Sequence, residues 1–273
     1  MAQATMPREP AVEISSRDTG LSFGFLYGAS CYLTRLLMTG CFDLRVYNVD
    51  RVPASGPAIL APNHVSTLDP IAVGTTLRRR IAYLARSSLF EIPVFGSFIA
   101  RLGALPVPRE SQAPREALEL CLRVLDRGRL LLLFPEGTRS ADGRIGELKK
   151  GTAWIARRSG APVIPVRVLG TYESWPRREG GVQTGILPRR FPIRVIYGNP
   201  LEYRTGESSD TFLARLRSTL ESLGLEEFGH ERRGPSWYWN AVQATPGAGC
   251  AVAERTSGSS SRPIHRREGE EPA

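Results

Sequence analysis

The segment NHVSTLDP, residues 63–70, places a histidine five residues before an aspartate. A carboxylate that binds one imidazole nitrogen orients the ring and leaves the other nitrogen free to act as a base. On one continuous helix the side chains of His64 and Asp69 would point well apart, so they can meet only across a turn. The strand-like AILAP before them and the helix-initiating Pro70 after them predict such a turn. Taken alone, however, the segment is explained better by an ordinary helix cap, with Asp69 or Ser66 as the capping residue.

A second segment, RLLLLFPEGTRS at 129–140, leads from an apolar strand directly into polar and charged residues. In open α/β sheets, ligands bind beyond the carboxyl ends of the strands. Gly137 would let backbone N–H groups approach an anion, and Arg139 offers a bidentate fork for phosphate. A glycine-containing surface turn is the alternative, but it does not explain why a buried strand ends in Glu-Gly-Thr-Arg. The glycine-rich P-loop pattern is absent from the segment.

Other basic residues fall at the ends of predicted elements. Arg109 follows a short strand in RLGALPVPRE, and Lys149 and Lys150 stand at the expected start of a helix, where the helix dipole favours anions. Only two of the 36 basic residues are lysines, so a general preference for arginine does not account for this adjacent pair. Together with Arg139, these residues predict one phosphate pocket.

Short apolar runs alternate with amphipathic stretches from about residue 44 onward. Several runs are almost wholly apolar, which is typical of strands covered on both faces. The expected strands are 44–49, 58–62, 80–85, 104–108, 129–134, 162–170 and 191–198, and the clearest helices are 114–128, 149–160 and 209–224. This alternation predicts a single α/β domain with a mostly parallel or mixed central sheet flanked by helices.

The composition narrows the class of protein. At 273 residues and 41% hydrophobic content, the chain suits one large domain with tails. A net charge of +9 favours anionic partners such as nucleic acid, an anionic membrane, or phosphorylated and CoA-like substrates. The four cysteines lack C-x-x-C spacing, which fits a reducing compartment, and the three histidines are too scattered to predict a metal site.

The two ends of the chain differ from its middle. Residues 21–44 form the longest apolar stretch, interrupted by Arg35 and three glycines. This segment has three possible interpretations: a membrane-spanning helix, a buried core helix, or a helix lying in the membrane interface. We favour the last. Residues 1–20 lack the apolar core of a signal peptide and are expected to be flexible. The α/β domain then covers 45–227, and the Gly-, Ser- and Pro-rich residues 228–273 are predicted to be a disordered tail.

Four segments, in their order and spacing, resemble the glycerolipid acyltransferase family, whose best-known members are the 1-acyl-sn-glycerol-3-phosphate acyltransferases. They are NH-x-x-x-x-D at 63–69, G-x-x-x-x-x-R at 103–109, FPEGTRS at 134–140 and VIPV at 163–166. The first and third segments together are highly specific, whereas the other two are weak alone. The resemblance covers roughly residues 40–205.

The resemblance implies transfer of a fatty acyl group from acyl-CoA or acyl-carrier protein to lysophosphatidic acid, giving phosphatidic acid. In this mechanism His64 is the general base, and Asp69 holds its tautomer and stabilises the imidazolium. The family binds the glycerol-phosphate acceptor at the positions of Arg109, Glu136, Gly137, Thr138 and Arg139. Lys149 and Lys150 are added on charge and position. Neither a metal nor a cofactor is implied, because the acyl thioester is itself a substrate.

Other functions stay open beside this one. The same chemistry could act on another lysolipid, a lyso-aminolipid or a glycolipid, and a non-catalytic lipid-binding protein is a further alternative. Nucleic-acid binding is suggested by the pI of about 9.9, but no binding motif supports it and the charge is spread through the domain. We expect peripheral or monotopic attachment to an anionic membrane surface, on the cytoplasmic face of a bacterial inner membrane. Residues 88–103 are expected to form an amphipathic core helix, with the lining of an acyl channel as the alternative.

Overall fold

The computed structural model describes residues 21–93, 95–101, 103–107, 114–176 and 188–224. The chain divides into two units, residues 1–227 and 228–273, and all described residues belong to the first. The expectations for residues 1–20, for the tail and for Arg109 lie outside the described residues.

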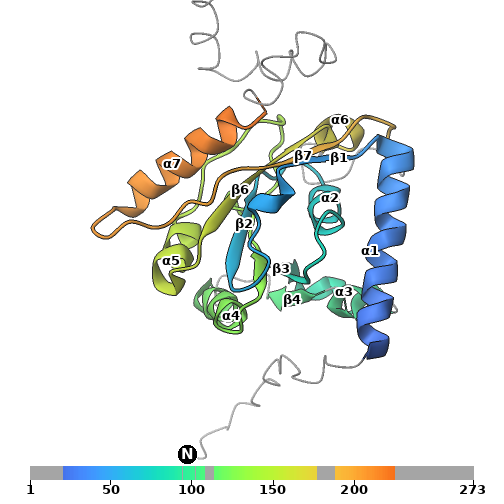
Figure 1. Ribbon diagram of the computed structural model, residues 1–273, viewed down its shortest axis with the longest axis horizontal. Coiled ribbons are helices and arrows are strands. Elements are labelled where there is room, and N and C mark those ends of the chain that lie inside the picture. Colours follow the sequence, from blue (N-terminus) through green and yellow to red (C-terminus); the bar gives the residue numbers. More distant parts are fainter. Residues whose placement is uncertain (1–20, 94, 102, 108–113, 177–187, 225–273) are drawn as a thin grey trace, which may run out of the picture. The chain divides into compact units, whose positions relative to one another are not determined.

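The described part of the chain contains a seven-stranded sheet in the order β1-β7-β6-β2-β5-β3-β4 (Figure 1). Its strands are β1 (Arg45–Tyr47), β2 (Ala58–Pro62), β3 (Ile81–Arg86), β4 (Ala104–Val107), β5 (Leu130–Leu132), β6 (Val163–Leu169) and β7 (Arg194–Tyr197). Each strand falls within, or within one residue of, a run that the apolar pattern predicts. The β6–β7 pair is antiparallel and the other neighbouring pairs are parallel, so the predicted α/β fold with a mostly parallel sheet is confirmed.

Two apolar cores lie on the two faces of this sheet. Alternate residues of β2 enter different cores, because successive side chains of a strand point to opposite faces: Ala58 and Leu60 join one cluster, and Ile59 and Ala61 join the other. The first cluster includes residues of α1 (Leu21–Phe42) and α2 (Asp69–Gly74). The second is covered by α4 (Pro114–Asp126), α5 (Lys150–Ser159) and α7 (Ser209–Ser222), as Figure 1 shows. The central strands are therefore buried on both faces, which explains their continuous apolar sequences.

The helix ends follow local sequence signals. The Ser208 side chain accepts a hydrogen bond from Thr211 N–H at the start of α7. Gly160 follows α5 with φ of 64°, a conformation that glycine adopts without strain. The helices predicted at 114–128, 149–160 and 209–224 are confirmed with ends shifted by at most two residues.

The segment 88–103 does not form the single helix that we predicted. A 3-10 turn covers Ser87–Leu89, and α3 (Phe95–Arg101) begins only after Pro93. Proline disfavours helical conformation in the residue before it and lacks the N–H that a helix interior requires. Gly96 also approaches Phe90 so closely that a side chain there would collide with the Phe90 backbone. Whether this segment contributes to an acyl channel stays a prediction.

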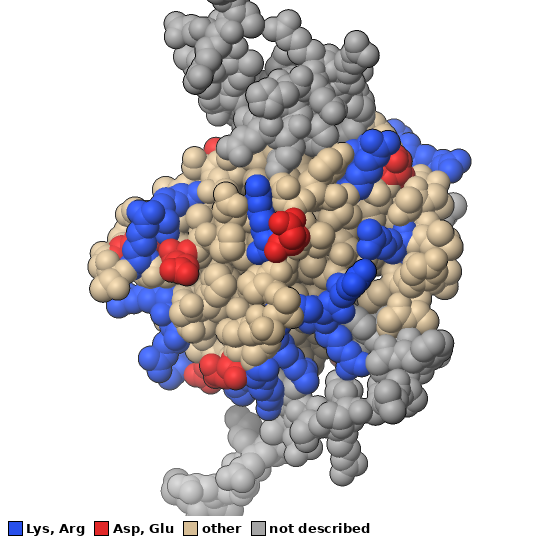
Figure 2. Space-filling model, viewed as in Figure 1, with Lys and Arg blue, Asp and Glu red and all other residues tan. Residues whose placement is uncertain are grey.

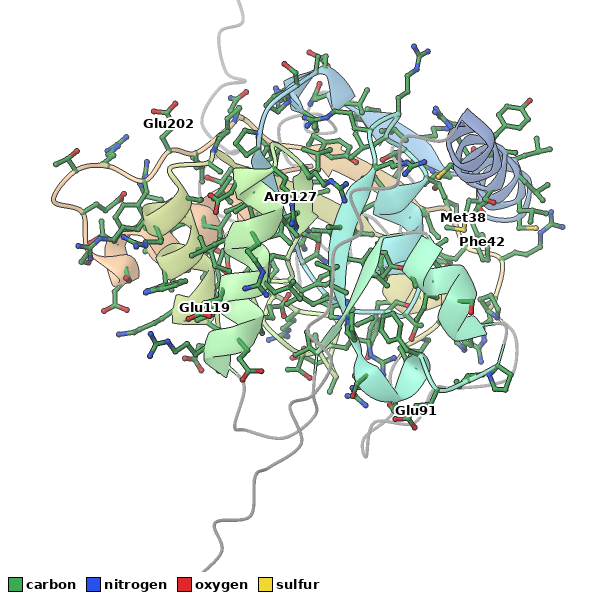
Figure 3. All side chains as sticks on the ribbon, turned by 90° about the horizontal axis from the view of Figure 1, so that it is seen from below. Met38, Phe42, Glu91, Glu119, Arg127 and Glu202 are labelled. Carbon is green, nitrogen blue, oxygen red and sulfur yellow. The ribbon has the colours of Figure 1, made fainter. Side chains whose placement is uncertain are left out.

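Helix α1 is apolar on both its covered and its uncovered sides. Met38 is buried in the core, and Phe42 packs against the same cluster; Figure 3 shows both on the side of α1 toward the sheet. The large apolar side chains on its exposed side are Tyr32, Leu33, Leu36 and Leu37. Within the ranges that the structure describes, no helix combines the length and the apolar character needed to cross a membrane.

The remaining described helical segments are short. They are the 3-10 turn Val49–Arg51 and the helix α6 (Thr171–Ser174), which follows β6. Residues just after α6 return to the loop that follows β2: Ser66 forms an isolated bridge with Pro176, and its hydroxyl donates to the Trp175 carbonyl at 2.8 Å. The loops after β2 and β6 are therefore tied together.

Candidate active site

The turn that the sequence predicts between His64 and Asp69 is present. β2 ends at Pro62, α2 begins at Asp69, and the loop between them brings His64 Nδ1 to 2.9 Å from Asp69 Oδ2. Asp69 is fully buried, and the His64 side chain is 17% exposed. An ionised carboxylate only accepts hydrogen bonds, so this contact places the ring hydrogen on Nδ1 and leaves the lone pair on Nε2. The pair thus has the geometry of an oriented base.

The Asp69 carboxylate also organises the loop around it. The same Oδ2 accepts hydrogen bonds from Val65 N–H at 2.7 Å and from Ser66 N–H at 2.8 Å. Both donors precede Asp69, so its carboxylate closes the turn before α2 and is not a cap on the helix's own N–H groups. The Ser66 hydroxyl accepts a weaker bond from Leu68 N–H at 3.3 Å. The helix-cap interpretation of this segment therefore does not describe what Asp69 does.

The FPEGTRS segment lies next to His64 because β5 and β2 are neighbouring parallel strands. Their carboxyl ends meet at one edge of the sheet, so the loops that follow them are adjacent. Phe134 stacks on the His64 ring with centroids 3.8 Å apart and an interplanar angle of 22°. Ser140 N–H donates to the His64 carbonyl at 2.8 Å. The histidine is thus held by its ring face, its ring edge and its backbone.

Glu136 is buried, with 3% of its surface exposed, and both carboxylate oxygens accept backbone hydrogen bonds. His64 N–H donates to Oε1 at 2.8 Å, and Gly146 N–H donates to Oε2 at 2.8 Å. Burial raises the pKa of Glu136, because a buried carboxylate loses hydration, while the two N–H donors oppose that rise. The Glu136 carboxylate therefore connects the FPEGTRS segment to the backbone of His64 in the first motif.

The rest of the FPEGTRS turn is more open. Gly137 has φ of 67° and its N–H donates to the Phe134 carbonyl at 3.0 Å, so the chain reverses tightly at a position that suits glycine. Gly137 and Thr138 are exposed. Arg139 reaches across to the first motif, where its Nη1 donates to Thr67 Oγ1 at 2.7 Å. This turn presents a guanidinium group beside the His64–Asp69 pair.

The side chains of Lys149 and Lys150 contact different parts of the molecule. Lys149 N–H donates to the Pro135 carbonyl at 2.8 Å, and its side-chain stem lies beside Gly137. The Lys149 ammonium pairs with Glu147 at 3.2 Å in an exposed setting. The Lys150 ammonium pairs instead with Asp210 of α7 at 3.2 Å. The structure therefore brings Lys149, but not the Lys150 ammonium, to the FPEGTRS turn.

Comparison with known proteins assigns the sequence to a family. A family model described as acyltransferase matches residues 43–169. A 1-acyl-sn-glycerol-3-phosphate acyltransferase of Bacillus subtilis is 32% identical over 159 residues, which cover 58% of this chain and 73% of the relative. The chain belongs to the glycerolipid acyltransferase family.

Further relatives of the acyltransferase agree with this assignment. A chloroplastic 1-acyl-sn-glycerol-3-phosphate acyltransferase of Brassica napus is 28% identical over 256 residues, covering 82% of this chain and 72% of the relative. The crystal structure of the acyltransferase PlsC from Thermotoga maritima superposes with a TM-score of 0.64 at 24% identity, covering 77% and 82% of the two chains. This structural likeness shows that the two proteins share a fold.

Sequence reasoning about the acyltransferase site missed three contributors. Asn63 is buried, and its side-chain amide bridges to Val168 of β6 through bonds of 3.0 and 2.7 Å. It thereby extends the β2–β6 pairing beyond the last residue of β2. Phe134 stacks on His64, and Gly146 donates to Glu136. Asn63 and Phe134 are the first residues of the NH-x-x-x-x-D and FPEGTRS segments but were given no role there, whereas no sequence signal distinguishes Gly146 from other loop glycines.

Proposed function

We propose that this acyltransferase moves a fatty acyl group from acyl-CoA or acyl-carrier protein to the free hydroxyl of lysophosphatidic acid, giving phosphatidic acid. The observation that carries the proposal is the buried Asp69 carboxylate bound to Nδ1 of a half-buried His64 beside an exposed, arginine-bearing turn. The relatives named as 1-acyl-sn-glycerol-3-phosphate acyltransferases support this choice of acceptor. Among the possible acceptors, we therefore favour those that carry a phosphate.

In the proposed reaction His64 Nε2 takes the proton from the acceptor hydroxyl as its oxygen attacks the thioester carbonyl. A C–O bond forms, the carbonyl becomes tetrahedral, and collapse of the intermediate breaks the C–S bond. The imidazolium then gives its proton to the departing thiolate, so the enzyme returns to its starting state. Asp69 stabilises the imidazolium and keeps the hydrogen on Nδ1.

We assign acceptor binding to the exposed turn Gly137–Arg139 together with Lys149. Arg139 offers a bidentate donor for a phosphate group, and its bond to Thr67 holds it near the first motif. The Lys149 ammonium adds a second cation. The buried Glu136 carboxylate is less suited to direct contact with an anionic acceptor. Arg109 remains a predicted ligand.

The test is thiol release from palmitoyl-CoA by the purified protein with three acceptors. Lysophosphatidic acid should support release, and the matching monoacylglycerol, which lacks the phosphate, should be slower by about tenfold or more, the equivalent of one lost charge-assisted contact. Lysophosphatidylcholine, whose phosphate is esterified with choline, tests whether the acceptor needs an unesterified phosphate. Faster release with either of these acceptors would replace the acceptor assignment. No release with any acceptor, from either the CoA or the acyl-carrier-protein thioester, would leave a non-catalytic lipid-binding role.

We further propose that the exposed apolar strip of α1, defined by Tyr32, Leu33, Leu36 and Leu37, attaches the enzyme to a membrane surface. These side chains are 56–72% exposed, while Met38 anchors the same helix in the core. Figure 2 shows Lys and Arg side chains in several separate groups over one face of the molecule. A net charge of +9 adds attraction to anionic lipids, and this dispersed arrangement suits a broad lipid surface better than one nucleic-acid groove.

Replacing Leu33 and Leu36 together by glutamate should weaken binding to phosphatidylglycerol-containing vesicles by about a hundredfold, because it removes two apolar contacts of about 1.5 kcal/mol each. Vesicle co-sedimentation measures the effect. Trp154→Glu is the matched control: Trp154 is 41% exposed on α5, which covers the opposite face of the sheet. Equal losses in both variants would show that α1 is not the attachment site.

A further inference from the structure

Arg217 of α7 holds a loop that contacts the candidate active site. Its Nη1 donates to the Gly146 carbonyl at 2.8 Å, and its Nη2 donates to the Ile145 carbonyl at 3.0 Å. The third donor, Nε, pairs with Glu221 one turn along the helix at 2.9 Å. Arg217 lies outside residues 43–169, which the family model matches. The guanidinium fork is therefore committed to the backbone of one loop.

That loop in turn defines where the Glu136 carboxylate lies. Ile145 is buried in the core beneath α7, and Gly146 N–H donates to Glu136 Oε2 at 2.8 Å. A Cβ atom at Gly146 would lie 3.0 Å from this same oxygen, so the loop backbone approaches the carboxylate as closely as glycine allows. The other oxygen of Glu136 accepts from His64 N–H at 2.8 Å. One continuous series of hydrogen bonds thus runs from α7 to the backbone of His64.

We infer that Arg217 is a positioning residue for acyl transfer, acting through the Ile145–Gly146 loop and the Glu136 carboxylate on the backbone of His64. Glu136 then serves to hold His64 and does not contact the acceptor: it is buried, both oxygens face backbone N–H groups, and a second negative charge would repel a phosphate. The role of Arg217 in acyl transfer rests on the proposed function. Its effect on the position of His64 does not.

Arg217→Ala should lower kcat about tenfold and change KM for either substrate by less than about twofold, since a small displacement of the base slows chemistry without removing a substrate contact. Arg217→Lys keeps one cationic donor near the two carbonyls and should recover part of the loss. A variant with unchanged kcat would overturn the inference, as would a loss confined to KM.

Arg215→Ala is the matched control on the same helix. Arg215 Nη2 donates to the Glu202 carbonyl at 2.8 Å and to Glu207 at 3.0 Å, so it holds the segment before α7 instead of the Ile145–Gly146 loop. Its kcat should stay within about twofold of wild type even if thermal stability falls. Equal losses of kcat in the Arg215 and Arg217 variants would mean that α7 matters only for stability.

A double-mutant cycle tests whether Arg217 acts through Glu136. Glu136→Gln leaves one of the two N–H donors facing an amide NH2, so it breaks the same series of bonds. The combined variant should lose much less kcat than the product of the single losses, whereas Arg215→Ala and Glu136→Gln should combine multiplicatively. Multiplicative losses for Arg217 and Glu136 would show that they act independently.

Amide hydrogen exchange separates this inference from the proposed function, because it needs no substrate. In Arg217→Ala the amides of His64 and Gly146 should exchange about tenfold faster or more, while core amides of β2 keep their rates. If the wild type transfers no acyl group but these amides respond, the proposed function fails and the structural connection stands. If the wild type is active and the amides do not respond, the connection fails alone.

Discussion

Replacing His64 by alanine should lower kcat for acyl transfer by about 10²–10⁴-fold, the usual contribution of a general base. The variant lacks the imidazole that the Asp69 carboxylate orients at 2.9 Å. Its fold should survive, since the backbone of His64 keeps its bonds to Glu136 and Ser140. Thiol release under saturating substrates, with thermal unfolding measured in parallel, tests this expectation.

Phe134→Leu is the control for loss of packing around the ring. It removes the stacking partner of His64 but leaves the Nδ1–Asp69 contact in place. Its kcat should fall by less than about tenfold, because the base is retained. If His64→Ala loses no more activity than Phe134→Leu, His64 is not the base and the mechanism proposed above is wrong.

The second large effect is expected at Asp69. Asp69→Asn should keep the loop and lower kcat by about 10²-fold, through loss of the negative charge that stabilises the imidazolium. The N–H groups of Val65 and Ser66 both point at the Oδ2 position, so they select the amide oxygen of the asparagine for that place. The same oxygen can then accept from His64 Nδ1–H, and the tautomer is preserved.

Asp69→Ala should lower both the stability and the activity further than Asp69→Asn. It leaves the buried N–H groups of Val65 and Ser66 without their acceptor, at a cost of about 1–3 kcal/mol each, and it frees the imidazole to rotate. The unfolding midpoint and kcat should therefore both fall further than in Asp69→Asn. If asparagine and alanine lower kcat equally while only alanine destabilises the fold, the charge of Asp69 has no part in catalysis beyond positioning.

The motifs and the strands are readable in the sequence because each depends on local information. The apolar runs of β2, β5 and β6 are continuous since both faces of these strands are covered. Pro70 marks the start of a helix, so the residues between the end of β2 and Asp69 must form a turn. The helix predicted across 88–103 failed for a reason that is also local, since Pro93 interrupts it. Local signals therefore account for most of the element assignments in the described chain.

The sequence by itself determined the α/β class, the placement of two motifs after strands, and the turn across which His64 and Asp69 can meet. Only the tertiary structure decided which side chains surround that pair, because the local sequence pattern does not specify the order of the strands in the sheet. The pairing of β2 with β5 places Phe134 on the His64 ring and Glu136 under its backbone. Lys149 and Lys150 are neighbours in sequence, yet their ammonium groups contact different elements, since side-chain direction depends on packing. Arg217 lies far from both motifs in sequence, and only the docking of α7 brings it to the loop that holds Glu136.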